Sequence, residues 1–168
     1  MKHRLRGCNL LETQKDTKDQ LDIANRLSFA SFSPEDRRTL AQVWEWISSK
    51  MPGILDRFYE YLNMFDETRS MVRVDVGGLK KAQMRHWNLM FNHSFGEDHV
   101  ASIVRIGEAH YGVGMAPRWY IAGYQRIMLE LMEIVGRPGL IGGNRAMAAT
   151  RAIGRAVMLD LDRSFAVL

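Results

Sequence analysis

Apolar side chains recur at the three- and four-residue spacing of an α-helix along nearly the whole chain after residue 33. No segment alternates apolar and polar residues for long enough to form a strand. Prolines punctuate the pattern where helices would begin, at Pro34, Pro52 and Pro117, and the glycines of segment 112–114 stand where one would end. The sequence therefore predicts an all-α fold.

The predicted helices differ in how clearly they are bounded. Ser33 and Pro34, followed by two acidic residues, form a strong helix start. The predicted helices run from Pro34 to Lys50, Pro52 to Asn63, Leu79 to Phe91, Val100 to His110, Pro117 to Val135 and Asn144 to Leu168. Residues 65–75 show no clear period and are predicted to be a loop. The polar residues 1–28 are predicted to form an arm with at most one short helix, and residues 29–168 a single domain.

Composition excludes several classes of protein. The single cysteine, Cys8, leaves no disulfide framework and no cysteine-based metal site, which favours a reducing, cytoplasmic location. No uninterrupted apolar run approaches the roughly 18 residues of a membrane span, and no signal peptide is expected. The net charge of +4 is scattered over the sequence. Binding to nucleic acid or to a membrane is therefore not expected.

Two of the five histidines occupy positions that suggest chemistry. His86 and His110 lie on the apolar faces of their predicted helices, where an unpaired imidazole is costly to bury. His3, His93 and His99 have polar neighbours and are predicted to lie at the surface. Zinc-protease, nucleophile-elbow and phosphate-loop motifs are missing from the sequence. Either buried histidine alone would more often be a core residue, but an apolar pocket with one histidine suits haem.

The residues around His110 match a longer pattern. The segment from Ile106 to Tyr120 reads I-x-x-x-H-x-x-x-G-M-x-P-x-W-Y, and it resembles the proximal segment of the globin domains of globin-coupled sensors. Upstream, Phe58-Tyr59-x-x-Leu62 resembles the helix of that family that carries the distal tyrosine. Residues 79–86 resemble the helix that crosses the distal face. The resemblance covers residues 33–168 and implies a globin fold of the sensor type with an N-terminal extension.

The resemblance also implies roles for individual residues. His110 would be the proximal ligand of the haem iron, and Tyr59 the distal hydrogen-bond donor to the gas. Tyr61 is the rival phenol, but two residues along a helix it points about 200° away from Tyr59. Ala82 stands where some relatives have Thr or Ser, and Gln83 could supply a replacement amide. The residues expected to contact the cofactor are Phe58, Leu62, Ala82, His86, Ile106, Met115, Trp119 and Tyr124. His86 has three open roles: a propionate contact, a sixth iron ligand or core packing.

The function implied is that of a gas sensor. The chain lacks C-x-x-C-H, so haem b would be held noncovalently and would bind a diatomic gas such as O₂. In the family, such a domain relays ligand binding to an output module: a diguanylate cyclase, a methyl-accepting signalling domain or a histidine kinase. No such module fits within the 168 residues, so the chain itself is not expected to be an enzyme.

The last two helices are the expected route to a partner. The predicted helix from Pro117 to Val135 is apolar nearly all round, and Ala148, Ala152 and Ala156 form a stripe of small residues on the last helix. A homodimer that stacks these helices into a four-helix bundle would cover both surfaces. Two other classes stay open: a stand-alone haem protein with redox or dioxygenase activity, and a haem-free helical interaction module.

Overall fold

The computed structural model describes residues 22–72, 75–138 and 142–165, and it confirms the predicted all-α class. The chain divides into two compact units, residues 1–33 and residues 34–168. In the first unit, residues 22–29 are helical, and Arg26 pairs with Asp22 one turn away at 2.8 Å. The rest of the predicted arm, residues 1–21, lies outside the described residues.

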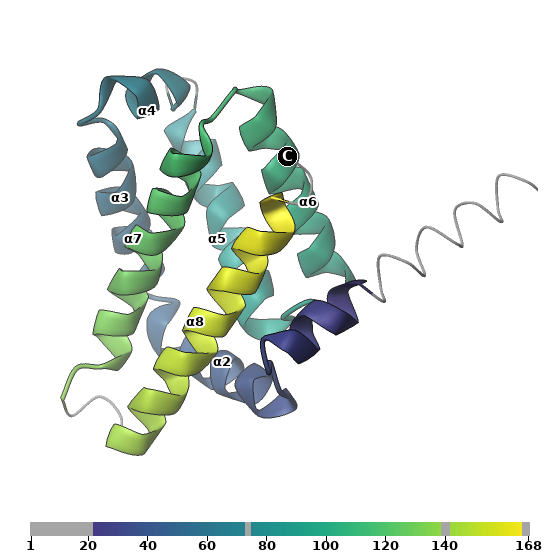
Figure 1. Ribbon diagram of the computed structural model, residues 1–168. Coiled ribbons are helices and arrows are strands. Elements are labelled where there is room, and N and C mark those ends of the chain that lie inside the picture. Colours follow the sequence, from purple (N-terminus) through teal and green to yellow (C-terminus); the bar gives the residue numbers. More distant parts are fainter. Residues whose placement is uncertain (1–21, 73–74, 139–141, 166–168) are drawn as a thin grey trace, which may run out of the picture. The chain divides into compact units, whose positions relative to one another are not determined.

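The second unit is a bundle of helices around one core (Figure 1). Helix α8 packs against α2, α6 and α7; α5 packs against α2, α3 and α6; and α3 also packs against α7. The helices are α2 (Pro34–Ile47), α3 (Met51–Leu62), α4 (Asp66–Met71), α5 (Val76–Asn92), α6 (Glu97–Gly112), α7 (Pro117–Val135) and α8 (Gly143–Phe165).

Helix starts follow the predicted signals. Helix α2 begins at Pro34 with two acidic residues in its first turn, α3 carries Pro52 in its first turn, and α7 begins at Pro117. The predicted loop over residues 65–75 is wrong, because Asp66–Met71 is the short helix α4. The buried Thr68 donates its hydroxyl proton to the carbonyl oxygen of Leu62 at 2.5 Å. Six residues are too few to show a helical period in the sequence.

The stripe of small residues on α8 faces inward. Ala152 and Ala156 are fully buried within the chain, and Ala148 is half-buried. The expectation that this stripe forms the dimer surface is therefore wrong. Small side chains serve here to bring α8 close to its neighbours in the same chain, where α2 and α7 make the most extensive contacts with it.

Helix α7 is buried on one side only. Tyr120, Ile127 and Leu131 point into the core, whereas Ile121 and Leu129 are 47% and 48% exposed. The apolar surface predicted nearly all round α7 is therefore only partly covered within the described structure. Across the described ranges, no helix is both long and apolar enough to cross a membrane.

Candidate functional site

The residues predicted to carry chemistry lie toward one end of the bundle. Helices α3, α6 and α8 end there, and α5 and α7 begin there (Figure 1). Tyr59 lies in the last turn of α3, and His110 in the last turn of α6. Gln83 lies in the first half of α5, and Tyr120 in the first turn of α7. The topology therefore gathers side chains that are far apart in the sequence.

The His110 imidazole is held in one tautomer by its own helix. Its Nδ1 lies 2.7 Å from the carbonyl oxygen of Ile106, which can only accept, so Nδ1 carries the proton. Burial lowers the pKa of His110, against the opposing effect of this hydrogen bond, and the ring stays neutral. The Nε2 lone pair has no hydrogen-bond partner among the described residues. A neutral imidazole with Nε2 free is the form that ligates a metal.

The turn after α6 brings α7 back against His110. Gly114 adopts φ +66°, a left-handed conformation that favours glycine, and the amide of Met115 donates to the His110 carbonyl oxygen at 3.1 Å. This turn places the ring of Tyr120 with its centroid 4.4 Å from that of His110. The predicted helix end at residues 112–114 is thus confirmed, and it positions an aromatic wall beside the imidazole.

Tyr59 is a buried phenol whose hydroxyl has no partner among the residues that the structure describes. Its ring is 5% exposed and meets Phe58 edge to face, with centroids 5.4 Å apart. Burial raises the pKa of Tyr59 to about 12, so the hydroxyl stays protonated and can donate. In the described part of the chain, no residue accepts this proton. Lys80 lies 5.8 Å from the ring centroid and pairs with Asp56 at 2.6 Å.

The neighbouring turn of α5 carries a second unpaired group. The Oε1 atom of Gln83 is buried without a hydrogen-bond partner in the described structure. Such an atom costs about 1 to 3 kcal/mol unless something pairs with it. Ala82, one residue earlier, is exposed and carries no polar group.

The remaining predicted contact residues supply apolar surface. The ring of Phe58 on α3 packs over Gly123 on α7, 3.4 Å from where a Cβ would sit. The ring centroids of Trp119 and Phe65 lie 5.5 Å apart, with the ring planes tilted by 42°. The half-buried residues of this group are Leu62, Ile106, Met115, Trp119 and Tyr124.

His86 and His99 both lie against one carboxylate. His86 is 3% exposed; its Nδ1 lies 3.0 Å from Ser102 Oγ and its Nε2 lies 3.1 Å from Asp160 Oδ2. His99 is fully buried, so its predicted surface position is wrong; its Nε2 lies 2.8 Å from the same oxygen. Sequence reasoning missed Asp160. The signal was available, because Asp160 continues the four-residue spacing of Ala152 and Ala156.

These residues fit a haem group on three observations. His110 offers a free lone pair, Tyr59 and Gln83 present unpaired polar groups, and the surrounding side chains are apolar. Haem requires one axial ligand, a water-excluding wall and a polar group near the gas. The donor set is therefore suitable for it.

Comparison with known proteins decides the family. The family model described as Protoglobin matches residues 19–166 of this sequence. The chain belongs to the protoglobin family. Its globin fold is confirmed by the globin domain of the Geobacter sulfurreducens globin-coupled sensor. The two structures match with a TM-score of 0.77 over 86% of this chain and 95% of that one, at 18% identity.

A curated relative of this protoglobin chain is a longer protein. The heme-based aerotactic transducer HemAT of Halobacterium salinarum is 24% identical over 118 residues, which cover 68% of this chain. The matched region is 24% of the transducer, so the chain spans about a quarter of the length of that relative.

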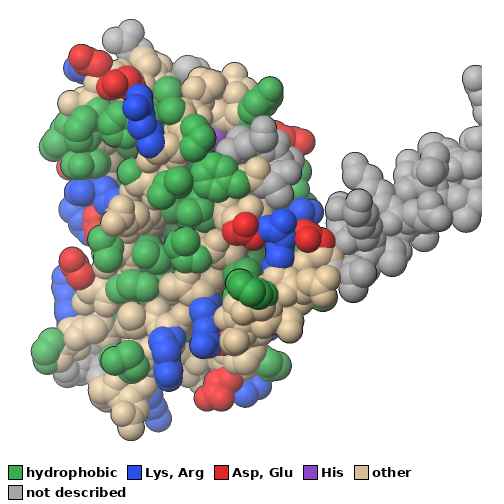
Figure 2. Space-filling view, viewed as in Figure 1, with side chains coloured by type: hydrophobic (Ala, Val, Ile, Leu, Met, Phe, Trp, Pro, Cys, Tyr) green, Lys and Arg blue, Asp and Glu red, His purple; other side chains and the backbone are tan. Residues whose placement is uncertain are grey.

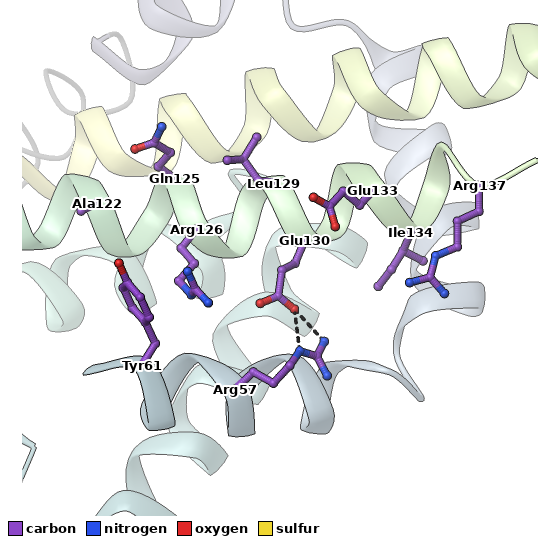
Figure 3. A pocket seen from close by; sticks show the side chains of 10 residues that line it. All are labelled: Arg57, Tyr61, Ala122, Gln125, Arg126, Leu129, Glu130, Glu133, Ile134 and Arg137. Atoms are coloured by element: carbon purple, nitrogen blue, oxygen red, sulfur yellow. Dashed lines mark hydrogen bonds and ion pairs between the residues drawn. The ribbon is translucent and has the colours of Figure 1, made fainter. Parts of the chain in front are cut away.

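The groove of the protoglobin chain seen in Figure 3 lies away from His110 and Tyr59. It has a volume of about 650 Å³, is lined by α3 and α7, and contains Tyr61. The guanidinium of Arg126 lies 3.7 Å from the Tyr61 ring centroid, and Arg57 donates two hydrogen bonds to Glu130 at 3.1 and 2.6 Å. Tyr61 thus faces this surface groove while Tyr59 is buried, as their separation on a helix requires.

Proposed function

We propose that this chain is a haem-based gas-sensing globin domain that binds a diatomic ligand such as O₂ at ferrous haem b. The observation that carries the proposal is the fixed tautomer of His110, whose Nε2 is left without a partner in the described residues. The family supports the presence of haem, and the HemAT relative supports a gas-sensing role. Haem, when bound, supplies an iron with one coordination position open to a gas.

The chain contributes an axial ligand on one side and a donor on the other. His110 Nε2 is the proposed iron ligand. The Ile106 carbonyl oxygen holds the imidazole proton on Nδ1, which leaves Nε2 deprotonated. The Tyr59 hydroxyl is the proposed donor to the gas, because it is buried, protonated and unpaired. Gln83 is the proposed second donor. The proposed contact residues Phe58, Leu62, Ala82, Ile106, Met115, Trp119 and Tyr124 complete the site. His86, whose ring nitrogens lie against Ser102 and Asp160, is proposed as a core residue instead.

Signal relay requires that ligand binding favour one of two arrangements of the last two helices. A 100-fold differential affinity, about 2.7 kcal/mol, is the scale needed for such coupling. One hydrogen bond from a buried phenol contributes about 1 to 3 kcal/mol. Making or breaking the Tyr59 bond can therefore supply much of that coupling.

The proposed receiver of the signal is a second copy of the chain or a fused output module. Apolar side chains form several patches on the face of the molecule seen in Figure 2. On α7 and α8, Ile121, Leu129, Met147 and Met158 are each about half exposed. A two-fold dimer would cover this surface with the same surface of its partner. The inward stripe of α8 then serves the fold, and the outward residues serve the dimer.

Absorption spectroscopy tests the proposal. The purified chain is reconstituted with haem, and the Soret band is recorded for ferrous protein with and without O₂. We expect an intense Soret band that shifts reversibly with O₂. The same protocol applied to His110→Ala is the control and should give little bound haem. A wild-type chain that takes up no haem would instead favour a haem-free interaction module, and rapid oxidation by O₂ would favour a redox role.

A further inference from the structure

One buried carboxylate gathers donors from three helices. Asp160, on α8, is fully buried, and the Tyr124 hydroxyl of α7 donates to its Oδ1 at 2.6 Å. The Nε2 atoms of His99 on α6 and His86 on α5 lie 2.8 and 3.1 Å from its Oδ2. A buried charge is tolerated only with such compensation. The position of α8 is thus tied to α5, α6 and α7 through a single side chain.

Tyr124 and His99 both donate hydrogen bonds to Asp160 in this cluster. The backbone N–H of Phe95 donates to His99 Nδ1 at 3.0 Å, so the His99 proton is on Nε2 and points to Asp160. Burial by itself raises the pKa of Asp160, but the charge of His86 and the hydrogen bonds from both histidines outweigh it and hold this pKa below the usual range. Burial and the nearby carboxylate raise the pKa of Tyr124, which therefore stays a donor.

This tautomer distinguishes a hydrogen-bond cluster from a metal site. His86, His99 and Asp160 bring ligand-type atoms within 4.8 Å of one another, a spacing that could hold an ion. A metal would need the lone pair of His99 Nε2, but that nitrogen carries the proton because Nδ1 accepts from Phe95. The cluster is therefore a network in which Tyr124 and His99 donate to one anion, and His86 Nε2 lies 3.1 Å from it.

The network continues to the proposed iron ligand. The Tyr120 hydroxyl donates to the Tyr124 hydroxyl at 3.3 Å, and Tyr124 in turn donates to Asp160. Tyr120 is 4% exposed, and its ring packs on the imidazole of His110. Rotation of Tyr120 would break this hydrogen bond and the one that its hydroxyl makes with Ser164, also on α8, and an unpaired buried hydroxyl is costly. The carboxylate on α8 thus fixes a ring that lies against His110.

We propose that Asp160 is a positioning residue for His110, acting through Tyr124 and Tyr120. This inference rests on the proposed function, since it assigns the orientation of the iron ligand to a residue on the last helix. A movement of α8 displaces Asp160, which shifts Tyr124 and Tyr120 and changes the orientation of the His110 ring. Linkage makes the effect reciprocal, so a change at His110 biases the position of α8.

Resonance Raman spectroscopy of the ferrous haem-loaded protein tests this role through the iron–histidine stretching frequency. Asp160→Asn removes the charge with little change of shape. Tyr124→Phe breaks the series of hydrogen bonds from Asp160 to Tyr120 while leaving Asp160 and both histidines in place. We expect both variants to shift the frequency in the same direction, and the double variant to shift it no further than the larger single effect. Ser102→Ala is the matched control. It removes a contact of His86 that is not part of the hydrogen-bond series from Asp160 to Tyr120, so the frequency should be unchanged.

The outcomes separate this inference from the function on which it rests. Tyr124→Phe removes only one hydroxyl, so the test survives if Asp160→Asn does not fold. A normal Soret band with wild-type frequency in Tyr124→Phe would overturn the positioning role alone. Equal shifts in Ser102→Ala would also overturn it, because they would indicate a general loosening of the core. A wild-type chain without a Soret band would remove the proposed function and this inference with it.

Discussion

The Nδ1 atom of His110 donates to the carbonyl oxygen of Ile106, one turn earlier on α6, at 2.7 Å. The helix itself thus selects the tautomer that leaves Nε2 unprotonated. Many metal-binding histidines obtain this selection from a carboxylate or carbonyl in another part of the structure. Here the selection depends only on local geometry, and it persists as long as the last turn of α6 is helical.

Replacement of His110 and replacement of His86 should have opposite consequences for haem retention. His110→Ala removes the only proposed axial ligand and should abolish or strongly weaken haem binding. His86→Ala should retain haem but unfold more readily, by roughly 3 to 5 kcal/mol, because Asp160 loses one partner of a buried pair. Pyridine haemochrome measures the first effect, and urea unfolding measures the second. Normal haem in His110→Ala together with loss of haem in His86→Ala would reverse the axial assignment.

Removal of the Tyr59 hydroxyl should speed release of the gas. Tyr59→Phe keeps the ring that packs on Phe58 and deletes only the proposed donor. Dissociation of O₂ and autoxidation should rise about tenfold or more, equivalent to about 1.4 kcal/mol. Stopped-flow displacement of O₂ by CO measures the rate. Gln83→Leu should have a smaller effect, and an unchanged rate in Tyr59→Phe would transfer the donor role to another residue.

Alkaline pH should destabilise the haem-free fold partly through Tyr59. Its pKa is about 12 in the folded chain against an ordinary value of 10, so the unfolded state loses its proton first as pH rises. The stabilisation is fully present below pH 10 and is lost progressively toward pH 12, by about 2 to 3 kcal/mol.

Urea unfolding between pH 8 and about pH 11, for wild type and Tyr59→Phe, isolates this contribution. As pH rises across that range, the unfolding free energy of wild type should fall relative to that of Tyr59→Phe. A constant difference would show that the phenol titrates in the folded state as it does in the unfolded one.

Charge placed on the two faces of α8 should have distinct effects. Met158→Glu, at a side chain 54% exposed, should leave folding and haem content intact and convert the proposed dimer to monomer. Ala152→Glu buries a charge in the core and should prevent folding. Sedimentation velocity and circular dichroism distinguish the two outcomes. Met64→Glu, at an exposed side chain in the α3–α4 turn, is the control and should remain dimeric. Wild-type protein that sediments as a monomer would remove the dimer from the proposal.

Most of the helix pattern could be read from the sequence because its signals are local. Prolines and glycines mark the helix ends, and an apolar face requires several turns to be visible. Helix α4 was missed for the second reason, since Asp66–Met71 is less than two turns long.

The buried network could not be read from the sequence because its partners are distant. His99 has polar neighbours in sequence and meets Asp160 only when α6 and α8 pack, 61 residues apart. Ala152 and Ala156 illustrate the same limit: a stripe of small residues does not indicate whether it faces its own chain or another. The placement of His110, Tyr59 and Gln83 in one haem site stays a prediction, supported by their polar groups that lack partners in the described structure.

The small side chains on the inner face of α8 also determine how this helix can move. Ala152 and Ala156 project little from the buried face of the helix. Gly154, on the side that meets α7, leaves room for the Met132 methyl group, which would lie 3.2 Å from a Cβ at this position. Lifting α8 away from the bundle would open a gap beneath it at the cost of its dispersion contacts, whereas a small slide along its axis keeps most of them. We therefore expect displacement of this helix to be a shear, transmitted lengthwise toward its ends and with little change in the distance between helices.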